Sequence, residues 1–280
     1  MTLVLTLILN DHVVLVADRR VVTHEGKICD DDTNKLVVHE GCHVFAYTGL
    51  ACLQGERTDR WMARVITESP RNSLLHVLKE LRRRATTAFR TIPRRHPLKR
   101  HAFAGVGWVK TLPDKCLRPC MFRVSNFHDR FGRYRTVAGD EFVVALTLLG
   151  NQGWFAWQST GQPLPDGFRI WLTRLLRRAG PRRANPDLLW LLCSRIIRGV
   201  ALSNEAVGRG LLAACIPRLA VPPNQLKIVS PLTRSLRFDR ELPSFLELAA
   251  RPTKCLLHGP TVVFGGVIVD ALRLVELGIE

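Results

Sequence analysis

The opening of the chain constrains the fold more than any other segment, because two apolar runs follow one another across a short polar turn. Residues 3–9 and 13–17 are almost wholly aliphatic, and residues 10–12, with the sequence Asn-Asp-His, separate them. Short aliphatic runs bounded by turn residues are typical of β-strands. The sequence therefore predicts an N-terminal β-hairpin. A secretion signal is not expected, since no basic leader or small-residue cleavage site accompanies the first run.

A threonine at position 2 adds chemistry to this hairpin. Removal of Met1, which a small second side chain permits, would leave Thr2 with a free α-amine beside its own hydroxyl. An α-amine with a pKa of about 7.7 to 8.0 can accept a proton near neutral pH, which a threonine hydroxyl needs in order to act as a nucleophile. The alternative is that Thr2 only begins an edge strand.

The composition is that of a globular chain. Of its 280 residues, 46% are hydrophobic and 23% are charged. No uninterrupted apolar run approaches the ~20 residues that cross a bilayer, so no membrane association is expected. We expect a single domain over residues 1–280, because no linker or low-complexity break separates its halves.

Cysteine usage indicates a reducing compartment. Eight cysteines are scattered along the chain without paired CxxC modules. A chain of this size does not need disulfides for stability. We therefore expect reduced thiols and a cytoplasmic location.

The most unusual compositional feature is a formal net charge of +17. Much of it comes from arginine clusters, among them residues 82–84, 94–95, 177–178 and 182–183. Such a surface attracts polyanions, including nucleic acid. The alternative, that these are solvated helix faces, is favoured because no nucleic-acid-binding motif accompanies them.

The remaining pattern alternates between strands and helices. Strands are expected at residues 35–39, 43–48, 102–109, 120–124, 142–149, 154–158, 211–216 and 261–269, and helices at residues 56–68, 73–90, 168–178 and 186–202. This order favours an α+β fold in which two stacked sheets carry helices on their outer faces, a four-layer αββα sandwich. The Pro-rich residues 217–260 are expected to form an insertion.

Several short motifs occupy strand ends. Asp18 and Arg20 form an Asp-x-Arg at the end of the second strand, Lys35 begins the third, and the fourth runs into Tyr-Thr-Gly-Leu-Ala at residues 47–51. Together with Thr2, these positions resemble the proteasome β-subunit family of N-terminal-nucleophile hydrolases, including its bacterial proteasome-like members. In that family the mature chain begins with threonine, and Asp-x-Arg follows at the same distance. The resemblance implies a threonine peptidase or amide hydrolase that assembles into a homo-oligomeric ring, and no cofactor or metal is expected.

The resemblance also implies the role of each residue. Thr2 is the nucleophile and its amine the proton acceptor, Lys35 is the cation that lowers the proton affinity of the hydroxyl, and Asp18 holds that lysine. Gly49 matches the glycine whose N–H stabilises the oxyanion, although it would also serve as a simple strand-to-helix break. Arg20 is expected to support the nucleophile, with a surface ion pair to one of residues 30–32 as the alternative.

The second half of the chain matches less well. Thr160, in Ser-Thr-Gly at residues 159–161, lies where the family has a serine near the amine. Glu205 replaces an aspartate, and Gly208 replaces a serine three residues later. Lys35 is also one residue further from Thr2 than usual, which requires an additional loop residue before it. Loss of a hydroxyl near the α-amine would loosen the proton-transfer network and give a slow or inactive enzyme.

Three hypotheses therefore stay open. The first is a peptidase that acts on peptide or protein substrates, and the resemblance leaves open whether an ATP-dependent unfoldase feeds the particle. The second is a catalytically silent scaffold of the same fold. The third is a polyanion-binding protein, motivated by the basic charge.

One metal-binding motif is set aside. Residues 39–43 satisfy H-E-x-x-H, but that zinc site needs both histidines one turn apart on a helix. The flanking sequences here predict strands, and a glycine inside the motif argues further against a helix.

Overall fold

The structure, a computed structural model, describes residues 2–23, 25, 27–31, 33–69, 73–92, 99–111, 116–150, 153–184, 186–218, 232–236, 261–264 and 267–270. Met1 and most of the expected insertion at 217–260 lie outside these ranges. Within them the chain is a mixed structure of helices and mainly antiparallel sheets.

The predicted N-terminal hairpin is confirmed, and it forms the centre of a five-stranded sheet. The sheet has the order β12-β1-β2-β13-β14, and every neighbouring pair is antiparallel. Its strands are β1 (Leu3–Leu9), β2 (His12–Asp18), β12 (Phe155–Gly161), β13 (Leu211–Pro217) and β14 (Leu232–Leu236). Both hairpin strands are buried along their whole length, which explains why their sequences are continuously aliphatic instead of alternating.

A second sheet has seven strands in the order β11-β10-β9-β6-β5-β15-β16. Its strands are β5 (Leu36–His39), β6 (His43–Thr48), β9 (Ala102–Lys110), β10 (Leu117–Ser125), β11 (Val143–Leu148), β15 (Thr261–Phe264) and β16 (Val267–Asp270). Only β15 and β5 run parallel among these neighbours. Where the sequence predicted one strand at residues 261–269, the structure has the antiparallel pair β15 and β16.

Two small ribbons and four helices complete the described part of the chain. The ribbons pair β3 (Val21–Val22) with β4 (Ile28–Asp30), and β7 (Cys52–Leu53) with β8 (Glu56–Arg57). The helices are α1 (Thr58–Thr67), α2 (Leu74–Phe89), α3 (Asp166–Arg183) and α4 (Pro186–Ser203). All four predicted helices are therefore confirmed. Gly180, with a φ of 68°, kinks α3 just before Pro181.

The apolar core is divided by the sheets. Along β1, Val4 and Ile8 belong to a cluster shared with β5, β6 and β9 of the other sheet, whereas Leu3, Leu5 and Leu7 belong to a cluster shared with α3 and α4. This split follows from the alternation of side chains along a strand. The two sheets thus face one another across the first cluster.

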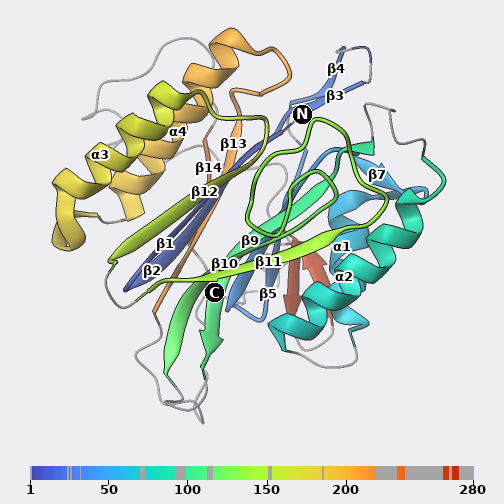
Figure 1. The fold of residues 1–280 in the computed structure, drawn as a ribbon, viewed down its shortest axis with the longest axis horizontal. Helices are drawn as coiled ribbons and strands as arrows, with labels where there is room; N and C mark the ends of the chain where they lie inside the picture. Colours follow the sequence, from blue (N-terminus) through green and yellow to red (C-terminus); the bar gives the residue numbers. More distant parts are fainter. Residues whose placement is uncertain are drawn as a thin grey trace.

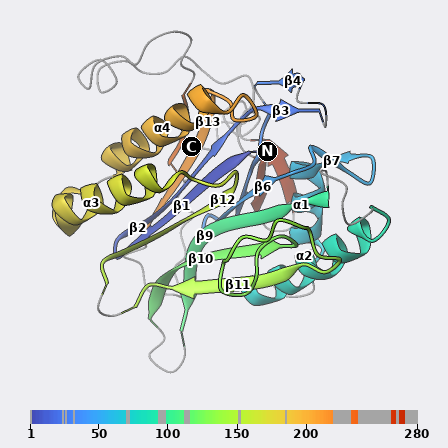
Figure 2. The same cartoon turned by 45° about the horizontal axis from the view of Figure 1, so that its top comes forward.

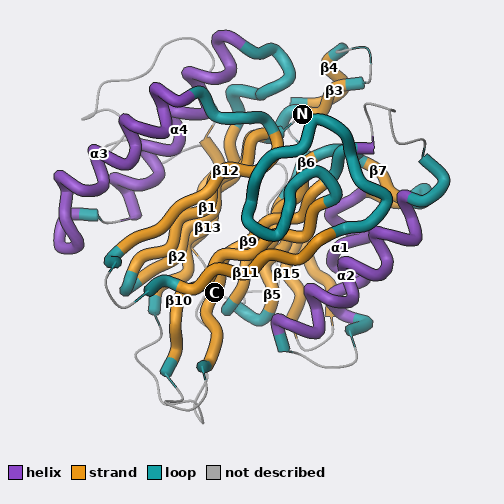
Figure 3. Tube along the Cα trace, viewed as in Figure 1, coloured by secondary structure: helices purple, strands orange, loops and turns teal. Residues whose placement is uncertain are grey.

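A third apolar cluster covers the other side of the seven-stranded sheet. It joins β6, β9 and β10 to α1 and α2. Figure 1 shows α3 and α4 beside one sheet and α1 and α2 beside the other, and Figure 3 shows the strands gathered between these helix pairs. No helix in the described residues is long and apolar enough to span a membrane.

Candidate active site

The predicted site residues come from one end of both sheets. In the five-stranded sheet, β1 begins where β2 ends, and in the seven-stranded sheet, β5 begins where β6 ends. Figure 2 shows the start of β1 close to the end of β6. Thr2, Asp18, Lys35 and Gly49 each lie within one residue of such a strand end. Antiparallel pairing therefore places residues from four separate segments together.

Thr2 is held by its backbone between the two sheets. Its carbonyl accepts hydrogen bonds from Thr48 Oγ1 at 3.1 Å and from the Gln162 N–H at 3.0 Å. Gly161, with a φ of +95°, passes so close that a Cβ there would lie 2.0 Å from the Thr2 carbonyl oxygen. Only glycine fits at this crossing, and Thr2 itself is 5% exposed.

Lys35 contacts the Thr2 hydroxyl directly. Its Nζ lies 2.5 Å from Thr2 Oγ1 and 3.4 Å from Asp18 Oδ1, and it also donates to the Arg20 carbonyl. An ammonium group has three donors, so all three are used. The extra residue before Lys35 does not prevent this contact.

Burial changes the acidity of the Lys35 ammonium group. The Lys35 side chain is 1% exposed, and loss of solvation lowers the pKa of its ammonium group, while the charge of Asp18 acts in the opposite direction. A lowered pKa makes the ammonium group of Lys35 a stronger hydrogen-bond donor to the adjacent hydroxyl oxygen. The ammonium form in turn stabilises negative charge that develops on Thr2 Oγ1.

Asp18 is fully buried, and its carboxylate is saturated with donors. Besides Lys35, it accepts from the backbone N–H groups of Leu3 at 2.6 Å, Arg20 at 3.0 Å and Gly208 at 3.2 Å. These bonds offset the cost of burying a carboxylate and fix its orientation. The structure therefore brings Thr2, Lys35 and Asp18 together as a connected chain of hydrogen bonds.

The Arg20 side chain points elsewhere. Its guanidinium forms a bidentate pair with Asp31, at 2.6 and 3.0 Å, and donates to the Glu205 carbonyl at 2.8 Å. The ion pair that the sequence offered as the alternative is thus present. Glu205 is exposed, and its backbone, instead of its carboxylate, makes this contact.

Gly208 explains one departure from the family pattern. A Cβ at this position would lie 2.6 Å from the Arg20 Cβ. A serine here would therefore force a local shift. The Gly208 N–H nevertheless contributes to the site, because it donates to Asp18.

Thr160 is buried on the same side as Thr2. It pairs with Val4 in the sheet, so alternation directs Thr160, Val4 and Thr2 toward the space between the sheets and directs Ser159 toward the helices. Thr160 Oγ1 has no hydrogen-bond partner among the described residues. No hydrogen bond joins the Thr160 and Thr2 side chains among these residues.

Gly49 has a conformation that few other residues adopt. Its φ is +115°, and a Cβ would lie 2.5 Å from His101 Nδ1 and 2.6 Å from the Arg100 carbonyl oxygen. Both observations require glycine here. His101 could not be predicted from the sequence, because its contact with Gly49 depends on the pairing of β6 with β9.

The arrangement of elements allows a comparison with known structures. A solved structure of the Anbu (Gly-1) mutant from Hyphomicrobium sp. strain MC1 superimposes with a TM-score of 0.52 and 14% sequence identity, over 89% of this chain and 92% of that one. The chain shares its fold with Anbu. A structure titled Anbu (ancestral beta-subunit) from Yersinia bercovieri matches with a TM-score of 0.48 and 11% identity, over 78% and 81% of the two chains. No protein-family model and no curated protein matches the chain by sequence.

The likeness to Anbu is one of fold alone and assigns no activity to this chain.

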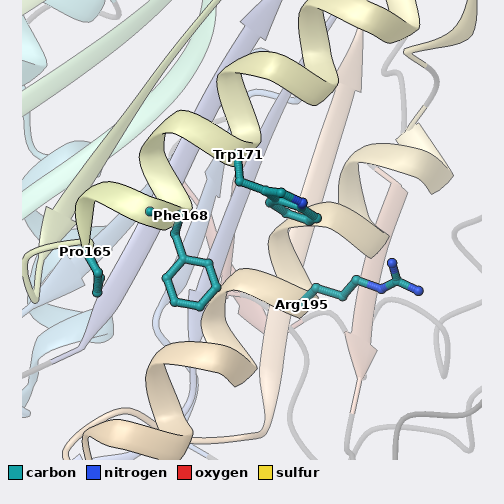
Figure 4. A pocket seen from close by; sticks show the side chains of 5 residues that line it. Pro165, Phe168, Trp171 and Arg195 are labelled. Atoms are coloured by element: carbon teal, nitrogen blue, oxygen red, sulfur yellow. The ribbon is translucent and has the colours of Figure 1, made fainter.

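A pocket of about 390 Å³ lies away from this cluster, between α3 and α4. Figure 4 shows Phe168 and Trp171 directed from α3 toward α4, where Arg195 lies. Gly199 on α4 admits the Phe168 ring, since a Cβ there would approach it to 2.4 Å. The pocket is thus a gap in helix packing at the surface.

The H-E-x-x-H sequence lies on a hairpin, as its flanks predicted. His39 ends β5 and His43 begins β6, with a turn at Glu40 and Gly41, both at positive φ. The two rings stack with centroids 5.8 Å apart. No group of three or more potential metal ligands occurs in the part of the chain that the structure describes.

Proposed function

We propose that this protein is a proteasome-like N-terminal threonine peptidase or amide hydrolase with a single four-layer αββα domain. The observation that carries the proposal is the 2.5 Å contact between Lys35 Nζ and Thr2 Oγ1, inside a buried network completed by Asp18. A buried ammonium group needs an acceptor for each of its three donors, and Lys35 uses the Thr2 hydroxyl as one of them, where its positive charge would stabilise a developing alkoxide.

The mechanism requires removal of Met1, which frees the α-amine of Thr2. Thr2 Oγ1 then attacks the carbonyl carbon of a peptide bond, and its proton passes to the amine, while the carbonyl electron pair moves to the oxygen. Collapse of this oxyanion reforms the carbonyl and breaks the C–N bond, and the leaving amine takes the proton. Water then hydrolyses the acyl ester and restores the hydroxyl.

The remaining residues have supporting roles in this proposal. Lys35 stabilises the developing alkoxide, Asp18 fixes Lys35, and the Gly49 N–H donates to the oxyanion. Thr160 is proposed to face the amine, and Glu205 to support Arg20 through its carbonyl. The likeness of fold to Anbu supports the further proposal that copies of the chain assemble into a homo-oligomeric ring, which would act on peptide or protein substrates with or without an unfoldase.

N-terminal mass measurement and covalent labelling test the proposal together. Protein from its native host should lack Met1, and a threonine-reactive peptide electrophile should add once per chain, at Thr2. Thr2→Ala should abolish labelling and turnover while assembly is retained. Labelling that survives this substitution would refute the role of Thr2.

A catalytically silent scaffold is the second candidate. Gly208 lacks a hydroxyl, and the carboxylate of Glu205 is exposed outside the hydrogen-bonded network of Thr2. Retention of Met1 in the native host would favour this scaffold, because the α-amine of Thr2 would then be an amide.

A basic groove on α2 favours a third candidate, binding of a phosphate-bearing polyanion. The groove measures about 360 Å³ and is lined by Lys79, Arg82, Arg83, Thr86, Thr87, Arg90 and Glu141. Two of these cations are paired, Arg82 with Glu141 at 3.5 Å and Arg83 with Glu80 at 2.6 Å, and Glu80 does not line the groove. Four cations and two hydroxyls around one cavity suit phosphate oxygens.

Inorganic polyphosphate is a suitable probe for this groove. Binding should weaken steeply as salt rises, and the double variant Lys79→Ala, Arg90→Ala should weaken it further. Arg169→Ala, Arg174→Ala on α3 removes the same charge elsewhere and is the matched control. Equal loss in both variants would show non-specific attraction only.

A further inference from the structure

We propose that His101 is a positioning residue for the oxyanion-binding turn at Gly49, an inference that rests on the function proposed above. His101 immediately precedes β9, and its ring fits against the turn that follows β6. It touches neither Thr2 nor Lys35 in the described contacts, so its influence would pass through the backbone of Gly49 and Leu50.

The first observation is a hydrogen bond that fixes the turn. The Leu50 N–H donates to His101 Nδ1 at 3.2 Å, and on the other side of the same residue the Leu50 carbonyl accepts from Thr58 Oγ1 at 2.7 Å. The peptide between Gly49 and Leu50 is therefore fixed by His101, and this sets the ψ angle of Gly49. Without the imidazole acceptor, the Leu50 N–H would be left to find another partner.

The second observation is steric. His101 Nδ1 and the Arg100 carbonyl occupy the space where a side chain at position 49 would lie. The ring thus limits rotation about Gly49 as well as bonding to its neighbour. A glycine at a φ of +115° is conformationally free in isolation, so an external restraint is needed to hold the turn at Gly49 in one conformation.

The third observation is that His101 is itself rigid. Its ring is fully buried and lies among aromatic rings, with centroids 4.7 Å from Phe103 and 5.0 Å from Phe89. Its backbone N–H donates to Asn126 Oδ1 at 3.0 Å, and its carbonyl accepts from the Asn126 N–H at 3.3 Å. Because these contacts hold His101 in one position, its ring can restrain the turn at Gly49.

The chemical state of the ring agrees with this role. An Nδ1 atom that accepts a hydrogen bond carries no proton, so a neutral ring has its proton on Nε2. Burial lowers the pKa of His101 to about 3, which keeps Nδ1 an acceptor throughout the neutral range. Nε2 has no hydrogen-bond partner among the described residues, which leaves the Leu50 bond as the polar contact of the ring.

Asn and Leu side chains have nearly the same size and shape, so a comparison of His101→Asn with His101→Leu isolates the hydrogen bond. Asn carries an acceptor oxygen on Cγ, the atom that carries Nδ1 in His101, whereas Leu carries only methyl groups there. Both remove the ring and should lower the melting temperature, His101→Asn by at least as much as His101→Leu because it buries an amide NH₂ group among aromatic rings. We expect His101→Leu to lower kcat by about 10- to 100-fold relative to His101→Asn, with KM changed by less than about threefold, because the oxyanion forms only after substrate binds.

The assay uses the best fluorogenic peptide for the wild-type enzyme together with a peptide aldehyde. Addition of Thr2 Oγ1 to the aldehyde carbon creates an oxygen that occupies the oxyanion position, so the inhibition constant should rise in parallel with the loss of kcat. If the ring variants do not fold, Thr58→Val serves instead, since it removes the bond to the same residue from the other side. It should produce the same selective loss of kcat.

The outcomes separate the two proposals. If the wild-type protein neither turns over peptides nor reacts with electrophiles, the proposed function is wrong, and the proposed role of His101 is wrong as well. If the wild type is active and His101→Leu matches His101→Asn in kcat and in aldehyde affinity, the proposed function stands and His101 is only a core residue.

Discussion

The backbone N–H of Gly208 donates a 3.2 Å hydrogen bond to Oδ1 of Asp18, although 190 residues separate them in the sequence. This bond joins the loop after α4 to the end of β2. The glycine that departs from the proteasome pattern therefore contributes through its backbone, and its lack of a side chain is a requirement of the contact with Arg20.

Gly208→Ser should accordingly impair the protein instead of improving it. A Cβ 2.6 Å from the Arg20 Cβ forces the loop away, which lengthens the bond to Asp18 and costs about 1 to 3 kcal/mol of stability. Urea unfolding and the labelling rate of Thr2 provide the measurements. Faster labelling with unchanged stability would mean that the missing hydroxyl, and not the backbone, limits the site.

Lys35→Met should remove both activity and stability. The substitution leaves the buried carboxylate of Asp18 without its cation, which costs about 3 to 5 kcal/mol, and it removes the group beside Thr2 Oγ1. We expect labelling of Thr2 to slow by about 10²- to 10³-fold. Lys79→Met on the surface of α2 is the control for loss of a lysine, and labelling that continues at the wild-type rate in Lys35→Met would show that Lys35 does not activate Thr2.

Arg20→Lys should leave the chemistry nearly intact. The guanidinium pairs with Asp31, while only the backbone carbonyl of Arg20 meets Lys35. Loss of the bidentate pair should cost about 1 kcal/mol and change labelling by less than about threefold. A loss as large as that of Lys35→Met would place the guanidinium in the catalytic network.

Gly49→Ala should be far more disruptive than Gly55→Ala. Both glycines have positive φ, +115° and +81°, but a Cβ at Gly49 collides with His101 whereas none of the described atoms lies within 4 Å at Gly55. Backbone strain alone costs about 1 to 2 kcal/mol, and the collision adds about 1 to 3 kcal/mol at Gly49. Melting temperatures of the two variants measure the difference, and equal values would show that the turn at Gly49 adapts.

Acid should destabilise the fold through its buried histidines. Burial lowers the pKa of His39 to about 4 and that of His43 to about 3, whereas both titrate near 6.5 when unfolded. Between these values the unfolded chain binds more protons, so stability falls as pH decreases from about 6.5 to 4, by up to about 1.4 kcal/mol per pH unit for each histidine. His43→Phe should reduce this slope in urea unfolding at pH 7 and 5, and an unchanged slope would contradict the assignment.

Prediction from sequence succeeded where local pattern decides structure. The β1–β2 hairpin and helix α2 follow from aliphatic runs and helical spacing, and the structure confirms both. The pair β15 and β16 was predicted as one strand, because nothing in the apolar pattern of residues 261–269 marks the reversal. The positions of Thr2 and Lys35 were expected from the resemblance, and the structure places them in contact.

The amino-acid sequence by itself determined which residue types stand at the strand ends: a threonine, a carboxylate, a lysine and a glycine. Only the tertiary structure decided which of their atoms meet. It gave Asp18 a backbone donor from Gly208, turned the Arg20 side chain toward Asp31, and set His101 behind Gly49. The physical reason is that propensity and periodicity are local properties, whereas these contacts depend on how strands far apart in sequence pair and how two sheets face each other.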